Sequence, residues 1–201
     1  FYYHYFAYAV LATIMMGVSS IMMAFNKPDL RRRNLCAPIP ARSRTLQLAA
    51  GHTIFALGCW SVLVLFSFVL YGRSLLSSGL VWLYCLNTLA FTIVSAGIGF
   101  LVGSSVRSNG AQAGAVNVIA NGMSFICGVF VPQSILSRHV LDFGRFLPAY
   151  WYVKANDAIS GLYRPTASSV RLIYGDVLIQ LAFAAAIFAV TLLLTKERQA
   201  G

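Results

Sequence analysis

The chain has 201 residues, of which 59% are hydrophobic and 10% are charged, and its formal net charge is +10 at pH 7. A soluble domain carries about 25% charged residues, so this composition excludes a soluble globular protein. The positive charge does not indicate nucleic-acid binding, because Lys and Arg of a membrane protein hold loops on the cytoplasmic side and contact anionic lipid there.

Five long apolar segments contain no Lys or Arg and a single carboxylate, Asp176. Each is long enough to cross a hydrocarbon core of ~30 Å as a helix, which takes about 20 residues. The sequence therefore predicts an all-α, polytopic membrane protein with one transmembrane domain in the lipid bilayer. The predicted spans are residues 1–25, 46–71, 80–103, 111–131 and 172–195.

The first predicted span begins at Phe1, with no charged segment before it and no cleavage site, so it is not a signal peptide. Five spans place the two ends of a chain on opposite sides of the membrane. One more N-terminal span would bring both ends to the cytoplasm. We therefore expect this chain to be the C-terminal part of a longer protein.

The connection over residues 26–45 contains six Lys and Arg residues and one acid, Asp29. This bias places the connection in the cytoplasm, and alternation of the spans then places the C-terminus there too. Pro28 and Asp29 favour the start of a short helix, which Pro38 and Pro40 end. Such a helix, held between two spans, is either a lipid-facing anchor or a docking element for a cytoplasmic partner.

Two spans carry rows of small residues. In residues 80–103 the row is Ser95, Gly99 and Gly103, for which we expect ordinary helix packing. In residues 111–131 small and polar residues share one helix face, which is typical of packing inside one bundle, of a homodimer seam or of the wall of a passage. This second row consists of Gly110, Gly114, Asn117, Asn121, Ser124 and Gly128.

A few polar residues lie within the spans. We expect His52 to be a hydrogen-bonded residue of a helix interface rather than a proton relay. Asp176 lies about one turn below the outer surface, where we expect it to reach water or Arg171. Asn87 and Thr88 allow no assignment from the sequence.

Residues 132–171, predicted to lie outside, are too apolar for a free loop and too interrupted for a span. The pattern predicts a short amphipathic helix in the membrane interface that ends at Pro148. An aromatic run, Tyr150 to Tyr152, follows at headgroup level, and a second helix over about residues 150–160 completes a helical hairpin. The hairpin is either a structural plug or a gate.

The chain contains no GxxxxGK[ST] motif, so it does not bind ATP through a P-loop of its own, and no catalytic or metal-ligating constellation is present in the sequence. We expect a transport or binding protein without enzyme activity and without a cofactor of its own.

The order of these features resembles the membrane subunit of type 2 ABC exporters, the ABC-2 permease family. The basic connection after Phe25 lies where that family has its coupling helix. Residues 128–132 (GVFVP) resemble its exit from the penultimate span, and residues 143–151 (FGRFLPAYW) resemble its outer hairpin. The family has six spans, so the resemblance implies that the first is absent here.

The resemblance implies an exporter in the cell (cytoplasmic) membrane, in which two permeases form a homodimer or heterodimer and separate ATPase subunits bind ATP and Mg²⁺. It implies that the ATPase contacts Leu30, Arg31, Arg32, Arg33 and Leu35. The passage or dimer seam would include Gly114, Asn117, Asn121, Ser124 and Gly128, with the first span opposite. The outer gate would include Pro132, Phe143, Arg145, Pro148, Tyr150 and Trp151.

Two other classes remain open. One is a membrane sensor or scaffold that uses the basic connection to hold a signalling partner. The other is an ion-coupled secondary carrier, which needs a titratable residue at mid-membrane, and both His52 and Asp176 lie near the ends of their spans. The apolar walls favour an amphipathic or lipid-like cargo.

Overall fold

The computed structural model describes residues 2–27, 29–30, 32–33, 41–162 and 166–200. Within these ranges the regular structure is helical and contains no β-strand, which confirms the predicted all-α class. In chain order the helices are α1 (Tyr2–Phe25), α3 (Ala41–Ser78), α4 (Val81–Ser105), α5 (Asn109–Ile126), α6 (Arg138–Gly144), α7 (Pro148–Ser160) and α8 (Ala167–Ala200).

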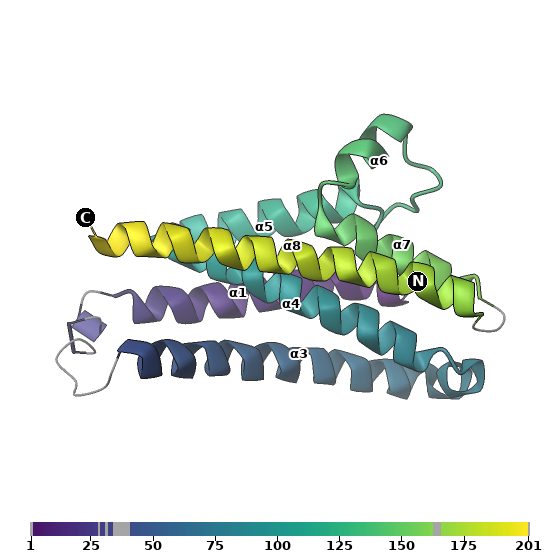
Figure 1. Cartoon of the computed structure of the whole chain (residues 1–201), viewed down its shortest axis with the longest axis horizontal. Coiled ribbons are helices and arrows are strands. Elements are labelled where there is room, and N and C mark those ends of the chain that lie inside the picture. The colour runs from purple at the N-terminus through teal and green to yellow at the C-terminus, as the bar shows by residue number, and fades with distance from the viewer. Residues whose placement is uncertain (1, 28, 31, 34–40, 163–165, 201) are drawn as a thin grey trace.

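Four of these helices contain a segment long and apolar enough to cross a membrane, as expected for a multi-pass membrane protein. The segments are Tyr2–Phe25, Gln47–Arg73, Val81–Ser105 and Ala167–Leu194. The long helices lie lengthwise in one bundle (Figure 1). The C-terminal ends of α1 and α8 lie at one end of the bundle, and α6, α7 and the N-terminus of the chain lie at the other (Figure 1).

Helix α5 differs from the span predicted over residues 111–131. It has 18 residues and ends at Ile126, and it is not among the helices long and apolar enough to cross a membrane. The chain turns at Gly128, whose φ of +96° is a conformation that other residues rarely adopt. The amides of Val129 and Phe130 cap the turn by donating to Ser124 O at 3.0 and 3.3 Å.

Helices α1 and α4 form the centre of the bundle and pack very closely. A Cβ atom built on Gly99 would lie 2.9 Å from Met15 Cα, and one on Gly103 would lie 2.7 Å from Ser19 Cα. Glycine is therefore required for the two backbones to approach. The small row of α4 packs inside the bundle, as its sequence indicated, and α3, α5, α7 and α8 surround the pair.

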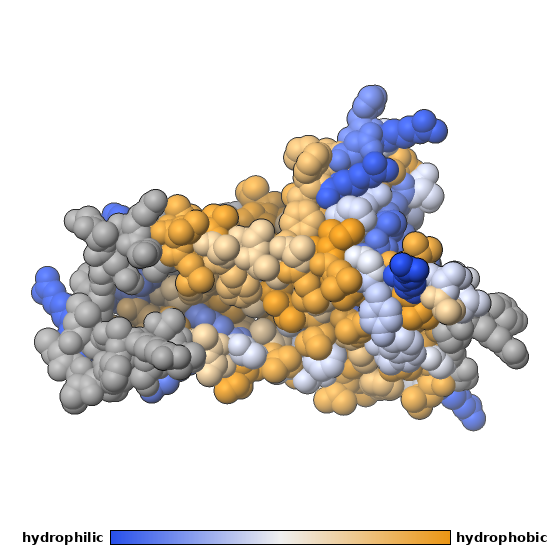
Figure 2. Space-filling model, in the orientation of Figure 1, coloured by the Kyte–Doolittle hydropathy of each residue, from blue (hydrophilic) through white to orange (hydrophobic). Residues whose placement is uncertain are grey.

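The predicted outer hairpin is present as α6 and α7, with one difference at their boundary. Helix α6 ends at Gly144, and Pro148 lies in the first turn of α7, where its missing N–H is not needed. One face of α7 is buried against α1, α4 and α8. Polar side chains gather over the α6 end of the bundle, whereas its flank is largely apolar (Figure 2).

Candidate functional site

The small, polar row of α5 divides into two parts in the structure. Gly114 and Asn117 are exposed, Asn121 is half-buried, and Ser124 and Gly128 are buried. A Cβ atom on Gly114 would meet nothing within 4 Å. Packing inside one bundle therefore accounts for the C-terminal part of the row, but the described residues leave the N-terminal part uncovered.

Helix α1 extends this uncovered face, because exposed residues of α1 contact α5 and the turn that follows it. The ring centroids of Tyr5, which is 53% exposed, and Phe130 lie 5.9 Å apart at one end. Exposed Ser20 lies at the other end and contacts Gln112 of α5. Thr13 and Met16 are exposed between them. We call the exposed residues Tyr5, Thr13, Met16, Ser20, Gly114 and Asn117, together with Asn121, the α1–α5 face.

A buried glutamine holds α5 against α1 at the edge of this face. Gln112 is 4% exposed, and its Nε2 lies 3.0 Å from Met16 O, 2.6 Å from Ser19 Oγ and 2.8 Å from Ser20 Oγ. The amide thus satisfies polar groups of α1 that apolar surroundings would leave unpaired. Gln112 makes α1 and α5 one unit near the end of the bundle where α1 leads into the basic connection.

The basic connection is described in part. Asp29, Leu30, Arg32 and Arg33 are helical, and all four are exposed. Arg31 and Leu35 of the predicted ATPase contact lie outside the described residues. Leu30, Arg32 and Arg33 therefore lie on helical backbone and present an apolar side chain and two cations to the surroundings.

A buried polar network links four helices near α7. The Nδ2 atom of Asn87 donates to Tyr152 O at 3.1 Å and to Asn156 Oδ1 at 3.0 Å. Asn87 Oδ1 accepts from Gln180 Nε2 at 2.8 Å. All of these side chains are buried, so their hydrogen bonds are shielded from competing water. Asn87 thereby joins α4 to α7 and α8.

The same network reaches α1 through one backbone carbonyl. Tyr3 O accepts from Tyr152 Oη at 2.6 Å and from Asn156 Nδ2 at 3.1 Å. Burial raises the pKa of the Tyr152 phenol, which therefore remains a neutral donor. We call this network of Tyr3, Asn87, Tyr152, Asn156 and Gln180 the outer hub. The sequence left Asn87 unassigned and did not single out Asn156 or Gln180, although polar residues in apolar helices were a usable signal.

Asp176 has a partner that the sequence did not predict. Its Oδ1 lies 2.8 Å from Lys154 Nζ of α7, and its side chain is 7% exposed. The sequence predicted a contact with water or with Arg171. Arg171 is not the partner, because five positions along a helix rotate a side chain ~140° away. Lys154 Nζ also lies 4.8 Å from the ring centroid of Trp151, so α7 supplies the cation together with an aromatic face.

His52 is buried between helices, as expected for an interface residue, but the expected hydrogen bond is not seen at its Nε2. Its exposure is 8%, and within the described ranges its Nε2 atom has no hydrogen-bond partner. Its ring meets Phe100 edge-on, with centroids 5.9 Å apart. Its surroundings on that side are aromatic, and this contact does not form a proton path.

The predicted gate residues do not form one surface. Pro132, Phe143 and Arg145 are exposed, whereas Pro148 and Tyr150 are buried. Half-buried Trp151 donates from Nε1 to Arg145 O at 2.9 Å, which ties the end of α6 to α7. Gln133 Nε2 contacts Cys127 O at 2.8 Å and Tyr150 O at 3.2 Å, which fastens the turn after α5 to α7 as well.

No family model, curated protein or solved structure matches this chain. The candidate site is therefore defined from the structure of this chain alone, and it has three parts. These are an uncovered small and polar face on α1 and α5, an exposed basic segment beyond the end of α1, and a buried hub that connects the outer hairpin to the bundle.

Proposed function

We propose that this chain is the membrane-spanning permease subunit of an ATP-binding-cassette exporter of the ABC-2 type. It moves substrate outward when a separate ATPase subunit, which binds ATP and Mg²⁺, hydrolyses ATP. The observation that supports this most is the α1–α5 face. Unpaired polar groups that face hydrocarbon cost free energy. The neighbour of this face is therefore expected to be a second permease subunit or a water-filled passage rather than lipid.

The same proposal makes α5 a fifth crossing. Eighteen helical residues rise about 27 Å, close to the ~30 Å thickness of a hydrocarbon core. Its polar composition is compatible with a crossing if its exposed face meets protein or water. The excess of Lys and Arg in residues 26–45 then puts this connection and the C-terminus in the cytoplasm of a cell-membrane protein.

Coupling follows from the connectivity of the candidate site. The ATPase docks on the segment around Leu30, Arg32 and Arg33, which follows α1 directly. Because Gln112 joins α5 to α1, a push on this segment moves both helices of the α1–α5 face. At the far end of α1, Tyr3 O accepts hydrogen bonds from two side chains of α7, so the outer hairpin moves together with α1. A displacement of α1 by the ATPase is thereby transmitted both to the α1–α5 face and to the outer hairpin.

The docking step is tested by a pull-down from native membranes with the tagged full-length protein. We expect wild type to capture an ATPase subunit and the combined Arg31→Ala, Arg32→Ala, Arg33→Ala variant, equally expressed, to lose it. Arg107→Ala is the matched control, because Arg107 is an exposed cation four residues after Gly103, which packs against Ser19 and Met22 near the C-terminal end of α1. If wild type captures no ATPase, the exporter proposal fails and the scaffold and carrier classes take its place.

The seam is tested by disulfide cross-linking in a background that lacks the four native cysteines. Asn117→Cys places a thiol on the α1–α5 face, and we expect a cross-linked dimer under mild oxidation. Val69→Cys is the control, because Val69 is 81% exposed on α3, which contributes nothing to that face. Equal cross-linking at both positions would indicate random collision and would argue against a seam at α5.

A further inference from the structure

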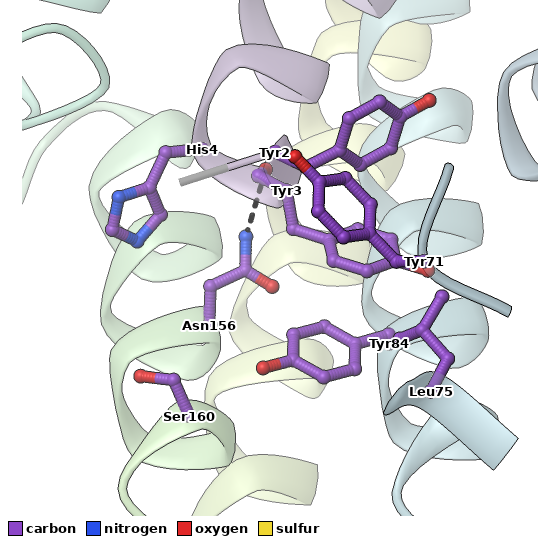
Figure 3. A pocket seen from close by; sticks show the side chains of 8 residues that line it. All are labelled: Tyr2, Tyr3, His4, Tyr71, Leu75, Tyr84, Asn156 and Ser160. Atoms are coloured by element: carbon purple, nitrogen blue, oxygen red, sulfur yellow. Dashed lines mark hydrogen bonds between the residues drawn. The ribbon is translucent and has the colours of Figure 1, made fainter. Parts of the chain in front are cut away.

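A cavity of about 350 Å³ lies near the N-terminal end of α1, and α5 does not line it. Tyrosines from three helices form its walls, namely Tyr2 and Tyr3 of α1, Tyr71 of α3 and Tyr84 of α4 (Figure 3). Asn156 and Ser160 of α7 lie on another side, toward which the hydroxyl of Tyr84 is directed (Figure 3). The cavity is therefore separate from the α1–α5 face and from any passage there.

Hydrogen bonds and ring contacts preform the aromatic walls. Tyr2 Oη donates to Leu63 O at 2.7 Å, and Tyr3 Oη lies 3.1 Å from Ser67 Oγ. The ring of Tyr84 stacks on that of Tyr3 with centroids 4.3 Å apart. Three of the four rings are thus held in place by the bundle before any ligand arrives, which lowers the entropy cost of binding.

The fourth ring is the accessible one. Tyr71 is 50% exposed, and its ring centroid lies 5.8 Å from that of Tyr2. Its substitution removes part of the cavity wall with little change to the buried core. Tyr71 is therefore the residue through which binding can be tested without unfolding the protein.

Charge around the cavity favours a cation. Among the described residues, its lining includes no Lys or Arg. His4 lines the cavity, and its Nε2 lies 2.9 Å from Asp157 Oδ1. The Asp157 carboxylate therefore lies next to a residue of the cavity wall. The faces of tyrosine rings attract cations electrostatically, and a nearby carboxylate adds to that attraction. An anionic ligand that lacks an ammonium group would find no opposite charge in this wall.

We propose that this cavity binds an ammonium group at the level of the lipid headgroups. Its position at the ends of three apolar helices is where interfacial tyrosines meet headgroups. Its volume falls in the range of small-molecule sites, of the order of 300–1,000 Å³. The ammonium group belongs either to the headgroup of phosphatidylethanolamine or to a free amine, and the site does not depend on the proposed transport role.

The test uses native mass spectrometry of the full-length protein released from detergent with equal amounts of phosphatidylethanolamine and phosphatidylglycerol that have the same acyl chains. We expect preferential retention of phosphatidylethanolamine. Tyr71→Leu should lower its apparent affinity by about tenfold, whereas Tyr71→Phe, which keeps the ring, should stay close to wild type. Asp157→Asn should weaken retention as well.

Tyr174→Leu is the matched control, because Tyr174 is a 42%-exposed tyrosine that packs against Trp82 outside the cavity. Free ethanolamine, added without lipid, distinguishes the two sources. If it binds with the same dependence on the Tyr71 ring while the lipid is not retained, a soluble amine is the ligand and the ammonium site stands. Equal retention of both lipids without binding of free ethanolamine, or an unchanged affinity in Tyr71→Leu, overturns the proposal.

Discussion

Replacing Asn87 by Leu tests whether the outer hub holds the hairpin to the bundle. The substitution keeps the side chain similar in size but removes three hydrogen bonds, two donated by Asn87 and one accepted from Gln180. Interhelical hydrogen bonds in membrane proteins contribute about 0.6 kcal/mol each on average, so the loss is about 2 kcal/mol. This corresponds to a roughly 30-fold change in the ratio of folded to unfolded protein.

A second effect acts in the same direction. Gln180 is fully buried, and in the part of the chain that the structure describes its Oε1 has no hydrogen-bond partner. In Asn87→Leu its Nε2 keeps only the 3.4 Å contact with Asp176 O. A buried amide left largely unpaired adds a desolvation penalty of about 1 kcal/mol or more, so we expect Asn87→Leu to cost about 3 kcal/mol or more.

The assay is unfolding of the purified full-length protein in mixed micelles with increasing SDS, followed by circular dichroism. Thr92→Val is the matched control on the same helix. Thr92 is 1% exposed, but its hydroxyl donates to Thr88 O within α4 at 2.9 Å, so its loss should cost less than about 1 kcal/mol. If the two variants unfold within about 0.5 kcal/mol of each other, the hub does not join the helices energetically.

Two further outcomes are expected from the packing of the bundle. Gly103→Ala should destabilise the protein by about 1–3 kcal/mol, because its Cβ would lie 2.7 Å from the Ser19 backbone, whereas Gly58→Ala, which meets nothing within 4 Å, should be neutral or slightly stabilising in the same SDS titration. Equal effects would mean that α1 and α4 can separate at no cost. A double-mutant cycle with Lys154→Met and Asp176→Asn should give a coupling of roughly 0.5–1 kcal/mol, since half-exposed Lys154 is screened by solvent. Additive effects would show that the 2.8 Å pair contributes no coupling.

The class of protein and most of the helical layout follow from local features of the sequence. Runs of about 20 apolar residues predict crossings wherever they occur, and four of the five predicted spans correspond to helices of sufficient length and apolarity. The outer hairpin was recognisable for the same kind of reason, because Pro148 and the aromatic run mark a local boundary. The row of Ser95, Gly99 and Gly103 indicated a packing face, since small residues on one face allow close approach.

The fourth predicted span shows where local features were insufficient. Both rows have small residues on one helix face, yet the row of α4 packs against α1 and half of the row of α5 lies uncovered. Composition determines how closely a face can be approached, but not what approaches it. The position of α5 beside α1 is set by tertiary contacts, among them the one that Gln112 makes with Ser19 and Ser20.

Polar partners were decided by the tertiary structure alone. The bond from Asn156 to Tyr3 O joins residues 153 positions apart, and even the pair of Lys154 and Asp176 spans 22 positions and two helices. A buried polar group needs a partner, so the sequence could show that Asn87 and Asp176 required one. It could not show which one, because the choice depends on helix rotation and depth. The membrane-protein class was determined by hydrophobicity along the chain, whereas the hub and the tyrosine cavity arise only where separate helices meet.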